Sequence, residues 1–286
     1  MKKALLLLTL IIFFASSAFA VCDYRSFCEK NRYKPTSRLG TIISRDTGAT
    51  LLSEKVAQAR IRKELKTFTK QRLNVSVKSY SLQDLLRGRL QSIVITGKNL
   101  NVEGVYLSYL ELRTVCDSNY IQIASKPIKF KENMIIHFST VVSDKDLKKT
   151  MDSNGYLDKL NCVNVKGCGI TFFKLSGAGV NIKNNKLNFK IKVTSELLLD
   201  KPLDIDLSSD LKVEDGRIVF TKIDLGKINS KVDLTKVGYR LNAMNPLTFT
   251  LNVFENENTK MCIKNVDVQG DKIIVNGNIF IPKTRD

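Results

Sequence analysis

The chain contains 286 residues, of which 43% are hydrophobic, and it carries a formal net charge of +18. This length is sufficient for one large β or α+β domain or for two small domains. The positive charge favours anionic partners such as phospholipid headgroups, nucleic acid or acidic polymers, and the absence of tryptophan disfavours a sugar-stacking site. Lysines that only keep the outer faces of strands soluble are the alternative explanation of the charge.

Residues 1–20 have the pattern of an export signal. Two lysines precede an apolar run over residues 5–14, and the small-residue pattern Ala18-Phe19-Ala20 follows it. A retained membrane anchor is the alternative, although the run is short for a membrane span. The bulky Val21 disfavours lipoprotein processing at Cys22. We therefore expect a periplasmic or extracellular protein that begins near Val21, and this location disfavours nucleic acid as the partner.

All six cysteines lie beyond this segment. In an exported protein an even number of cysteines is typical of disulfides. A zinc site is disfavoured because the chain has no C-x-x-C pair and only one histidine. The spacing suggests two local loops and one long-range bridge, although other pairings stay open. The suggested pairs are Cys22 with Cys28, Cys162 with Cys168, and Cys116 with Cys262.

Residues 21–46 are polar and lack periodicity, which predicts a cysteine-bearing N-terminal extension. Residues 47–73 are predicted to form a long helix whose apolar residues fall on two nearly opposite sides. The two groups are Leu52, Val56 and Ala59, and Ile61, Leu65 and Phe68. Either the helix breaks near Arg60, or it is contacted on different sides along its length. Its many basic residues are typical of a solvated face, and a surface that meets an anionic membrane is the alternative.

The next segments are predicted to be short helices and strands. A helix over residues 82–86 ends at Gly88, and strands follow at residues 93–95, 102–114, 120–123 and 128–140. Ser143 is predicted to begin another helix, because Asp144 and Asp146 suit the exposed N–H groups of a first turn.

The second half of the chain is predicted to be a meander of strands. Apolar and polar residues alternate most clearly over residues 186–194. Turns are expected at Asn184-Asn185, Asp215-Gly216 and Gly270-Asp271, and a short helix over residues 233–244. Because each such strand has one dry face, a second sheet, the helices or a ligand must cover it.

No catalytic or metal-binding pattern is evident. His137 is the only histidine and lies within a strand, and no G-x-S-x-G motif is present. Asp204, Asp206 and Asp210 resemble a calcium loop, but Ser209 replaces its glycine and no glutamate closes it. We therefore expect neither an enzyme nor a bound cofactor. An envelope hydrolase would require a pair of acids that converge from distant positions.

One stretch carries a family resemblance. Residues 82–95 read Leu-x-x-Leu-Leu-x-Gly-x-Leu-x-Ser-Ile-x-Ile, and residues 97–112 read Gly-x-x-Leu-x-Val-x-Gly-Val-x-Leu-x-x-Leu-x-Leu. This pattern resembles the core of the LmeA-like phospholipid-binding proteins, and the resemblance extends over about residues 48–281. It implies an α+β, TULIP-like fold for residues 47–286. In this fold a strongly curved antiparallel sheet wraps around a long N-terminal helix, with one or two further short helices and an apolar groove.

The resemblance also implies binding of phospholipid acyl chains outside the cytoplasm, in envelope lipid transfer or homeostasis. Basic residues near the mouth of the groove would hold the phosphate, and an anionic membrane surface is a second expected partner. The apolar positions expected to face the groove are Ile61, Leu65, Phe68, Ile93, Ile95, Leu107, Leu110, Phe189 and Ile191. An exported structural or adhesion domain, whose own side chains fill its core, is the alternative.

Overall fold

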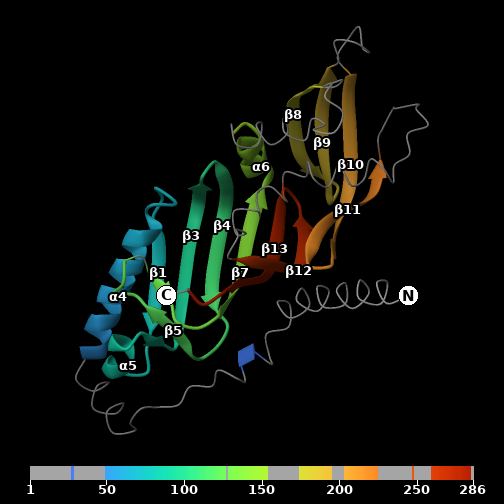
Figure 1. The fold of residues 1–286 in the computed structure, drawn as a ribbon. Helices are drawn as coiled ribbons and strands as arrows, with labels where there is room; N and C mark the ends of the chain where they lie inside the picture. Colours follow the sequence, from blue (N-terminus) through green and yellow to red (C-terminus); the bar gives the residue numbers. More distant parts are fainter. Residues whose placement is uncertain are drawn as a thin grey trace, which may run out of the picture.

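The computed structural model describes residues 27–28, 49–126, 128–153, 174–194, 203–224, 247 and 259–284. Antiparallel sheet predominates in these residues and helices are few, so the expected α+β class is confirmed. Two sheets form most of the described structure, and α6 (Asp144–Met151) lies between them (Figure 1). The expected helix over residues 233–244 and the expected leader over residues 1–20 lie outside the described residues.

The larger sheet has six strands in the order β1-β3-β4-β7-β13-β12, and every neighbouring pair is antiparallel. The strands are β1 (Leu73–Lys78), β3 (Ser92–Val102), β4 (Val105–Thr114), β7 (Met134–Ser143), β12 (Lys260–Gln269) and β13 (Lys272–Ile281). Glu103 and Gly104, with φ of 51° and 88°, make the turn between β3 and β4, so the strand expected over residues 102–114 begins at Val105. Among the described strands the sheet is open, with β1 and β12 at its edges.

A change of alternation in β3 brings Leu100 onto the same face of this sheet as Leu73. Asn99 adopts a φ of 50°, which is uncommon for a residue with a side chain. A Cβ on Gly97 would lie 2.8 Å from a δ carbon of Leu100 and 2.7 Å from one of Leu73. Leu100 therefore lies over Gly97 on the Leu73 side, although strict alternation would place Leu100 on the opposite face.

The second sheet has four strands in the order β11-β10-β9-β8. These are β8 (Lys174–Lys183), β9 (Lys186–Thr194), β10 (Leu203–Glu214) and β11 (Arg217–Asp224). Asn184 and Asn185 have φ of 54° and 57°, and Asp215 and Gly216 have φ of 50° and 72°. Two consecutive positive φ values suit the tight turn of a hairpin, so both predicted turns are confirmed.

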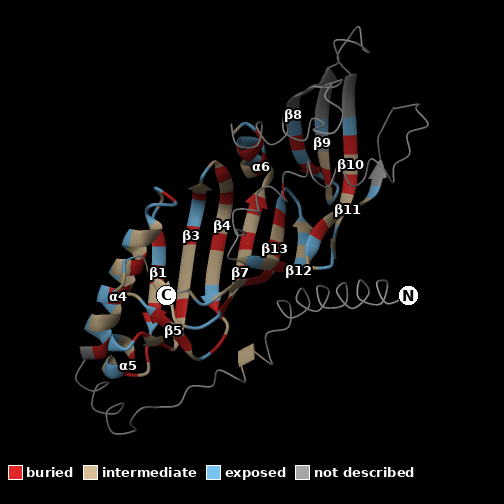
Figure 2. Ribbon diagram, viewed as in Figure 1, coloured by how far each residue is buried: buried red, intermediate tan, exposed pale blue. Residues whose placement is uncertain are grey.

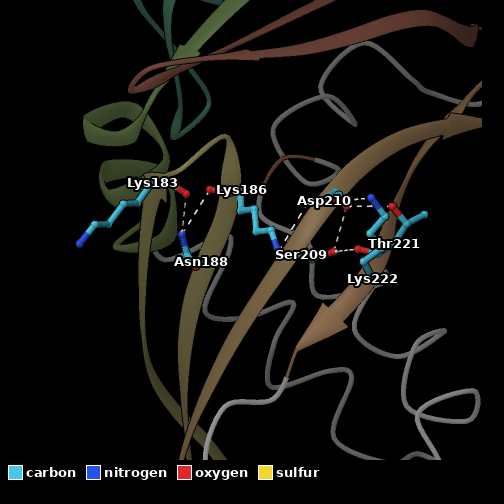
Figure 3. Close-up of polar contacts among 7 residues, drawn as sticks. All are labelled: Lys183, Lys186, Asn188, Ser209, Asp210, Thr221 and Lys222. Carbon is cyan, nitrogen blue, oxygen red and sulfur yellow. Dashed lines mark hydrogen bonds and ion pairs between the residues drawn. The ribbon is translucent and has the colours of Figure 1, made fainter.

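Polar groups connect three strands of the second sheet (Figure 3). The Asp210 carboxylate lies 3.0 Å from Lys222 Nζ and 4.0 Å from Lys186 Nζ. The Ser209 hydroxyl donates to the Thr221 carbonyl at 2.8 Å. Such exposed ion pairs contribute little stability, so the apolar side holds this sheet in place. Its buried residues are Val180, Ile182, Leu187, Leu207, Ile218 and Phe220.

The α6 helix joins the two sheets. Ser143 caps it and forms a capping box with Asp146, which confirms the predicted helix start. Leu147 and Met151 of α6 are fully buried in the same core as Leu107 of β4 and the apolar side of the second sheet. A backbone hydrogen bond of 2.8 Å from Ile263 to the Gly216 carbonyl connects the two sheets a second time.

The first long helix, α4 (Ala49–Leu65), is shorter than the helix expected over residues 47–73. It is continuous through Arg60, and turns occupy the residues between Leu65 and β1. Ala57 and Ile61 pack with Val75 of β1 in one core cluster. The structure therefore shows a 17-residue helix packed at the β1 end of an open sheet, and does not show a strongly curved sheet around a long helix.

A small third sheet lies beside α4. It comprises β2 (Arg89–Leu90), β5 (Asn119–Gln122) and β6 (Lys129–Phe130), and the short helix α5 (Leu82–Leu86) precedes it. The single strand expected over residues 128–140 is therefore two strands, because β6 pairs with β5 whereas β7 pairs with β4 and β13.

The disulfide pairing differs from the one expected. Cys28 is bonded to Cys116, with 5.2 Å between their Cα atoms, so the pairs Cys22–Cys28 and Cys116–Cys262 are wrong. Proximity in sequence misled the prediction, because the chain at Cys28 lies against the large sheet, where the ring of Phe27 meets that of Phe280 at 6.4 Å. Cys262 also forms a disulfide. Cys22, Cys162 and Cys168 lie outside the described residues.

Candidate functional site

The structure separates the residues expected to line a groove into several groups. Ile61 and Ile93 are buried together between α4 and the sheet, whereas Leu107 and Leu110 are buried in the core that α6 shares with the second sheet. Phe68 lies beyond the end of α4 and is 56% exposed. The side chains of Phe189 and Ile191 lie outside the described residues, although both positions belong to β9.

Two of the expected residues lie where the two core clusters meet. Leu65 and Ile95 are partly buried and pack against both clusters. Ile136 of β7 and Ile281 of β13 do the same. These four residues lie at the junction of the two core clusters, and Leu65 and Ile95 are the members of the expected set among them.

A different set of residues beside α4 forms an open pocket. A pocket of about 650 Å³ opens between α4, α5 and the turn that follows β5, and we refer to it as the α4–α5 pocket. Its apolar walls come from both helices and from this turn. The residues are Val56, Ala57, Leu85, Leu86, Ile123 and Ala124.

Gly88 sets the position of α5 in this pocket. It has a φ of +79°, and a Cβ at this position would lie 2.6 Å from the Ile121 carbonyl oxygen. The Ile121 N–H donates to the Gly88 carbonyl at 2.8 Å. Only glycine therefore allows the chain after α5 to lie this close to β5.

The charged residues that line the pocket are cationic. Its described lining residues include Arg60, Arg87, Lys126 and Lys131 and no aspartate or glutamate. Arg60 is held in place by Glu64, with 2.9 Å between Nη2 and Oε1, and its Nη2 donates to the Ser125 carbonyl at 3.5 Å. An apolar cavity with cationic lining residues fits an amphiphile that has an anionic headgroup.

Comparison with protein families gives a match over most of the chain. The model of the LmeA-like phospholipid-binding proteins matches residues 45–278, a span that includes α4, α5, β5 and the whole α4–α5 pocket. The chain belongs to the LmeA-like phospholipid-binding family. Comparison with curated proteins and with solved structures gave no significant match.

This LmeA-like protein has a second basic pocket at the C-terminal end of α4. It measures about 300 Å³, and its described lining contains Arg62, Lys66, Lys70 and Arg72. The Nε of Arg62 is buried and has no hydrogen-bond partner in the described part of the chain. Cationic pockets therefore adjoin α4 along its middle and at its C-terminal end, and both lie within the matched span.

The tyrosine beside the α5 cap stays neutral. Tyr80 precedes Ser81, whose hydroxyl accepts from the Asp84 N–H and caps α5, and the Tyr80 hydroxyl donates to the Asp117 carbonyl at 2.7 Å. Burial raises the pKa of Tyr80 above its usual value, and the carboxylates of Asp117 and Asp84 raise it further. Tyr109 behaves alike, because burial and its hydrogen bond to Glu111 raise its pKa.

Sequence reasoning missed most of the α4–α5 pocket of this LmeA-like protein. It identified Gly88 as a helix end, but nothing local indicates that Lys126 would face α4.

In the described residues, no three His, Cys, Asp or Glu side chains form a metal-binding group. Nor is any described helix long and apolar enough to cross a membrane.

Proposed function

We propose that this LmeA-like protein is exported and binds a phospholipid in the α4–α5 pocket without catalysing a reaction on it. The observation that carries the proposal is the combination of apolar walls with four cationic lining residues, of which Arg60 is paired with Glu64, and no acid in the described lining. A neutral metabolite would gain nothing from these cations, and a fully polar anion would gain nothing from the walls.

The energetics support an amphiphile. Each acyl CH₂ that is buried contributes about 0.8 kcal/mol, so a few methylenes offset the cost of ordering the chain. The pocket volume of about 650 Å³ is typical of a small-ligand site and suits part of one acyl chain. The phosphate would lie among the cationic lining residues and would accept charge-assisted hydrogen bonds from them. These residues are Arg60, Arg87, Lys126 and Lys131.

Two features support export to the periplasm or the extracellular space. The first is the signal-like pattern of residues 1–20. The second is the presence of a disulfide between Cys28 and Cys116, since disulfides persist in oxidising compartments. The role that fits this location is transfer of phospholipid within the envelope or maintenance of its lipid composition.

Bound lipid is the direct test. Mass spectrometry of an organic extract of natively purified protein should detect phospholipid, and the Ala124→Trp variant should retain on the order of tenfold less, because its indole fills the pocket. Asn74→Trp places the same bulk on an exposed position of β1 and should retain the parent level. Equal lipid in both variants would contradict the assignment of this pocket.

The extract also tests the absence of catalysis. We expect intact phospholipid after prolonged incubation with the protein, because the described lining of the pocket offers no acid, histidine or cysteine. Lysophospholipid or free fatty acid would indicate a hydrolase instead. Reproducible absence of any lipid would favour the structural or adhesion domain, an alternative supported by the burial of Ile61, Ile93, Leu107 and Leu110 in filled cores.

A further inference from the structure

Apolar side chains are exposed to solvent on one part of the molecule. Leu51, Leu52 and Val56 of α4 are 63%, 68% and 70% exposed, and Leu86 of α5 is 77% exposed. We call these four residues the outer patch. In the described part of the chain the remaining large hydrophobic residue of this kind, Phe68, lies just beyond α4. In Figure 2 much of α4 and α5 is accordingly coloured as exposed.

Helix geometry places Leu52 and Val56 on one side of α4, with Leu51 about 100° around the helix from Leu52. Val56 precedes Ile61 by five residues, so at 100° per residue it lies on the opposite side of α4 from this buried side chain. Leu52 lies one turn before Val56. Val56 and Leu86 also line the α4–α5 pocket, so the outer patch adjoins its mouth.

The acids of the two helices are hydrogen-bonded, ion-paired or buried. Glu54 accepts from the Ser79 N–H at 2.7 Å, Glu64 pairs with Arg60, and Asp84 is buried at the α5 cap. The cations remain outside, because Lys55, Lys63 and Arg87 are all exposed. The outer surface of α4 and α5 is therefore aliphatic and positively charged.

We propose that the outer patch docks this protein on the surface of a bilayer that contains anionic lipid, with the mouth of the α4–α5 pocket against the headgroups. Leucine and valine side chains enter the headgroup–acyl boundary, and the neighbouring lysines and arginine meet the anionic phosphates. A soluble protein rarely exposes clustered aliphatic residues unless they meet a partner. The inference rests on the proposed lipid function, because docking would bring the pocket to its ligand.

Vesicle binding tests the docking. The purified mature protein should co-sediment with vesicles of phosphatidylcholine and phosphatidylglycerol at a ratio of about three to one, and weakly with phosphatidylcholine alone. The double variant Leu51→Ser/Leu52→Ser should bind the anionic vesicles on the order of tenfold more weakly. Neither residue belongs to the described lining of the pocket, so this variant should keep the lipid it carries after purification.

A second variant tests the charges independently. Lys55→Gln/Lys63→Gln should weaken binding to the anionic vesicles and leave binding to phosphatidylcholine unchanged. Lys145→Gln/Lys212→Gln removes two exposed lysines elsewhere and should bind like the parent. Parental affinity of the leucine variant for anionic vesicles, or equal binding of the parent to both vesicle types, would overturn the docking. Retained lipid in that case would leave the proposed function standing, whereas docking without bound lipid would refute the function alone.

Discussion

Single backbone positions decide the shape of the site. Gly88 has a positive φ and lies against the Ile121 carbonyl, and Asn99 shifts the alternation of β3 so that Leu100 covers Gly97. The end of α5 just before Gly88 was predictable from the sequence, since glycine often terminates helices. The shift at Asn99 was not, because asparagine visits positive φ only in some contexts.

A substitution at Gly88 tests this role. Gly88→Ala should lower the free energy of unfolding by roughly 1–3 kcal/mol, because a Cβ is strained at φ of +79° and would meet the Ile121 carbonyl oxygen at 2.6 Å. Urea denaturation measures the effect. Gly179→Ala is the matched control, since a Cβ there would meet nothing within 4 Å. Equal stability of the two variants would show that the chain at α5 relaxes freely.

At the scale of elements, the residue types of a turn or a helix cap were sufficient to predict the local structure. The turns at Asn184-Asn185 and Asp215-Gly216 and the start of α6 at Ser143 agree with the sequence-based predictions. The faces of α4 were less accessible. Its pattern showed two apolar sides, but not that the Ile61 side is buried and the Val56 side exposed.

The α6 cap provides a test at this scale. Ser143→Ala should lower the free energy of unfolding by about 1 kcal/mol, because the N–H of Asp146 loses its acceptor and the capping box is broken. Ser143→Thr keeps a hydroxyl at the cap and should lose less. Thermal unfolding followed by circular dichroism distinguishes the two, and an alanine variant as stable as the threonine variant would count against the cap.

At the scale of the whole molecule, distant parts of the chain meet in ways that no local pattern reveals. The Cys28–Cys116 disulfide closes a loop across a sequence separation of 88 residues, and the α4–α5 pocket combines α4 with a turn some sixty residues later. Pairing by sequence spacing therefore failed for Cys28 and Cys116, and Lys126 and Lys131 could not be assigned to a site in advance.

The disulfide gives a global prediction. Cys28→Ser/Cys116→Ser should lower the free energy of unfolding by about 2–5 kcal/mol, because the unfolded chain regains the freedom that the cross-link removes. Denaturant titration under oxidising conditions measures the loss. Because Cys262 also forms a disulfide, a reductant should destabilise the double variant further. An unchanged midpoint in the double variant would show that the N-terminal segment is held by other contacts.

The position of β13 has a consequence for how this protein folds. Lys272–Ile281 pairs with β7 along its whole length, and β12 pairs with β13 in turn. This register joins Ser143 to Lys272 and Met134 to Ile281, residues that lie far apart in the sequence, and such non-local pairing forms slowly. While this pairing is incomplete, one edge of β7 is open to pairing with another chain, so a high protein concentration during refolding should favour aggregation.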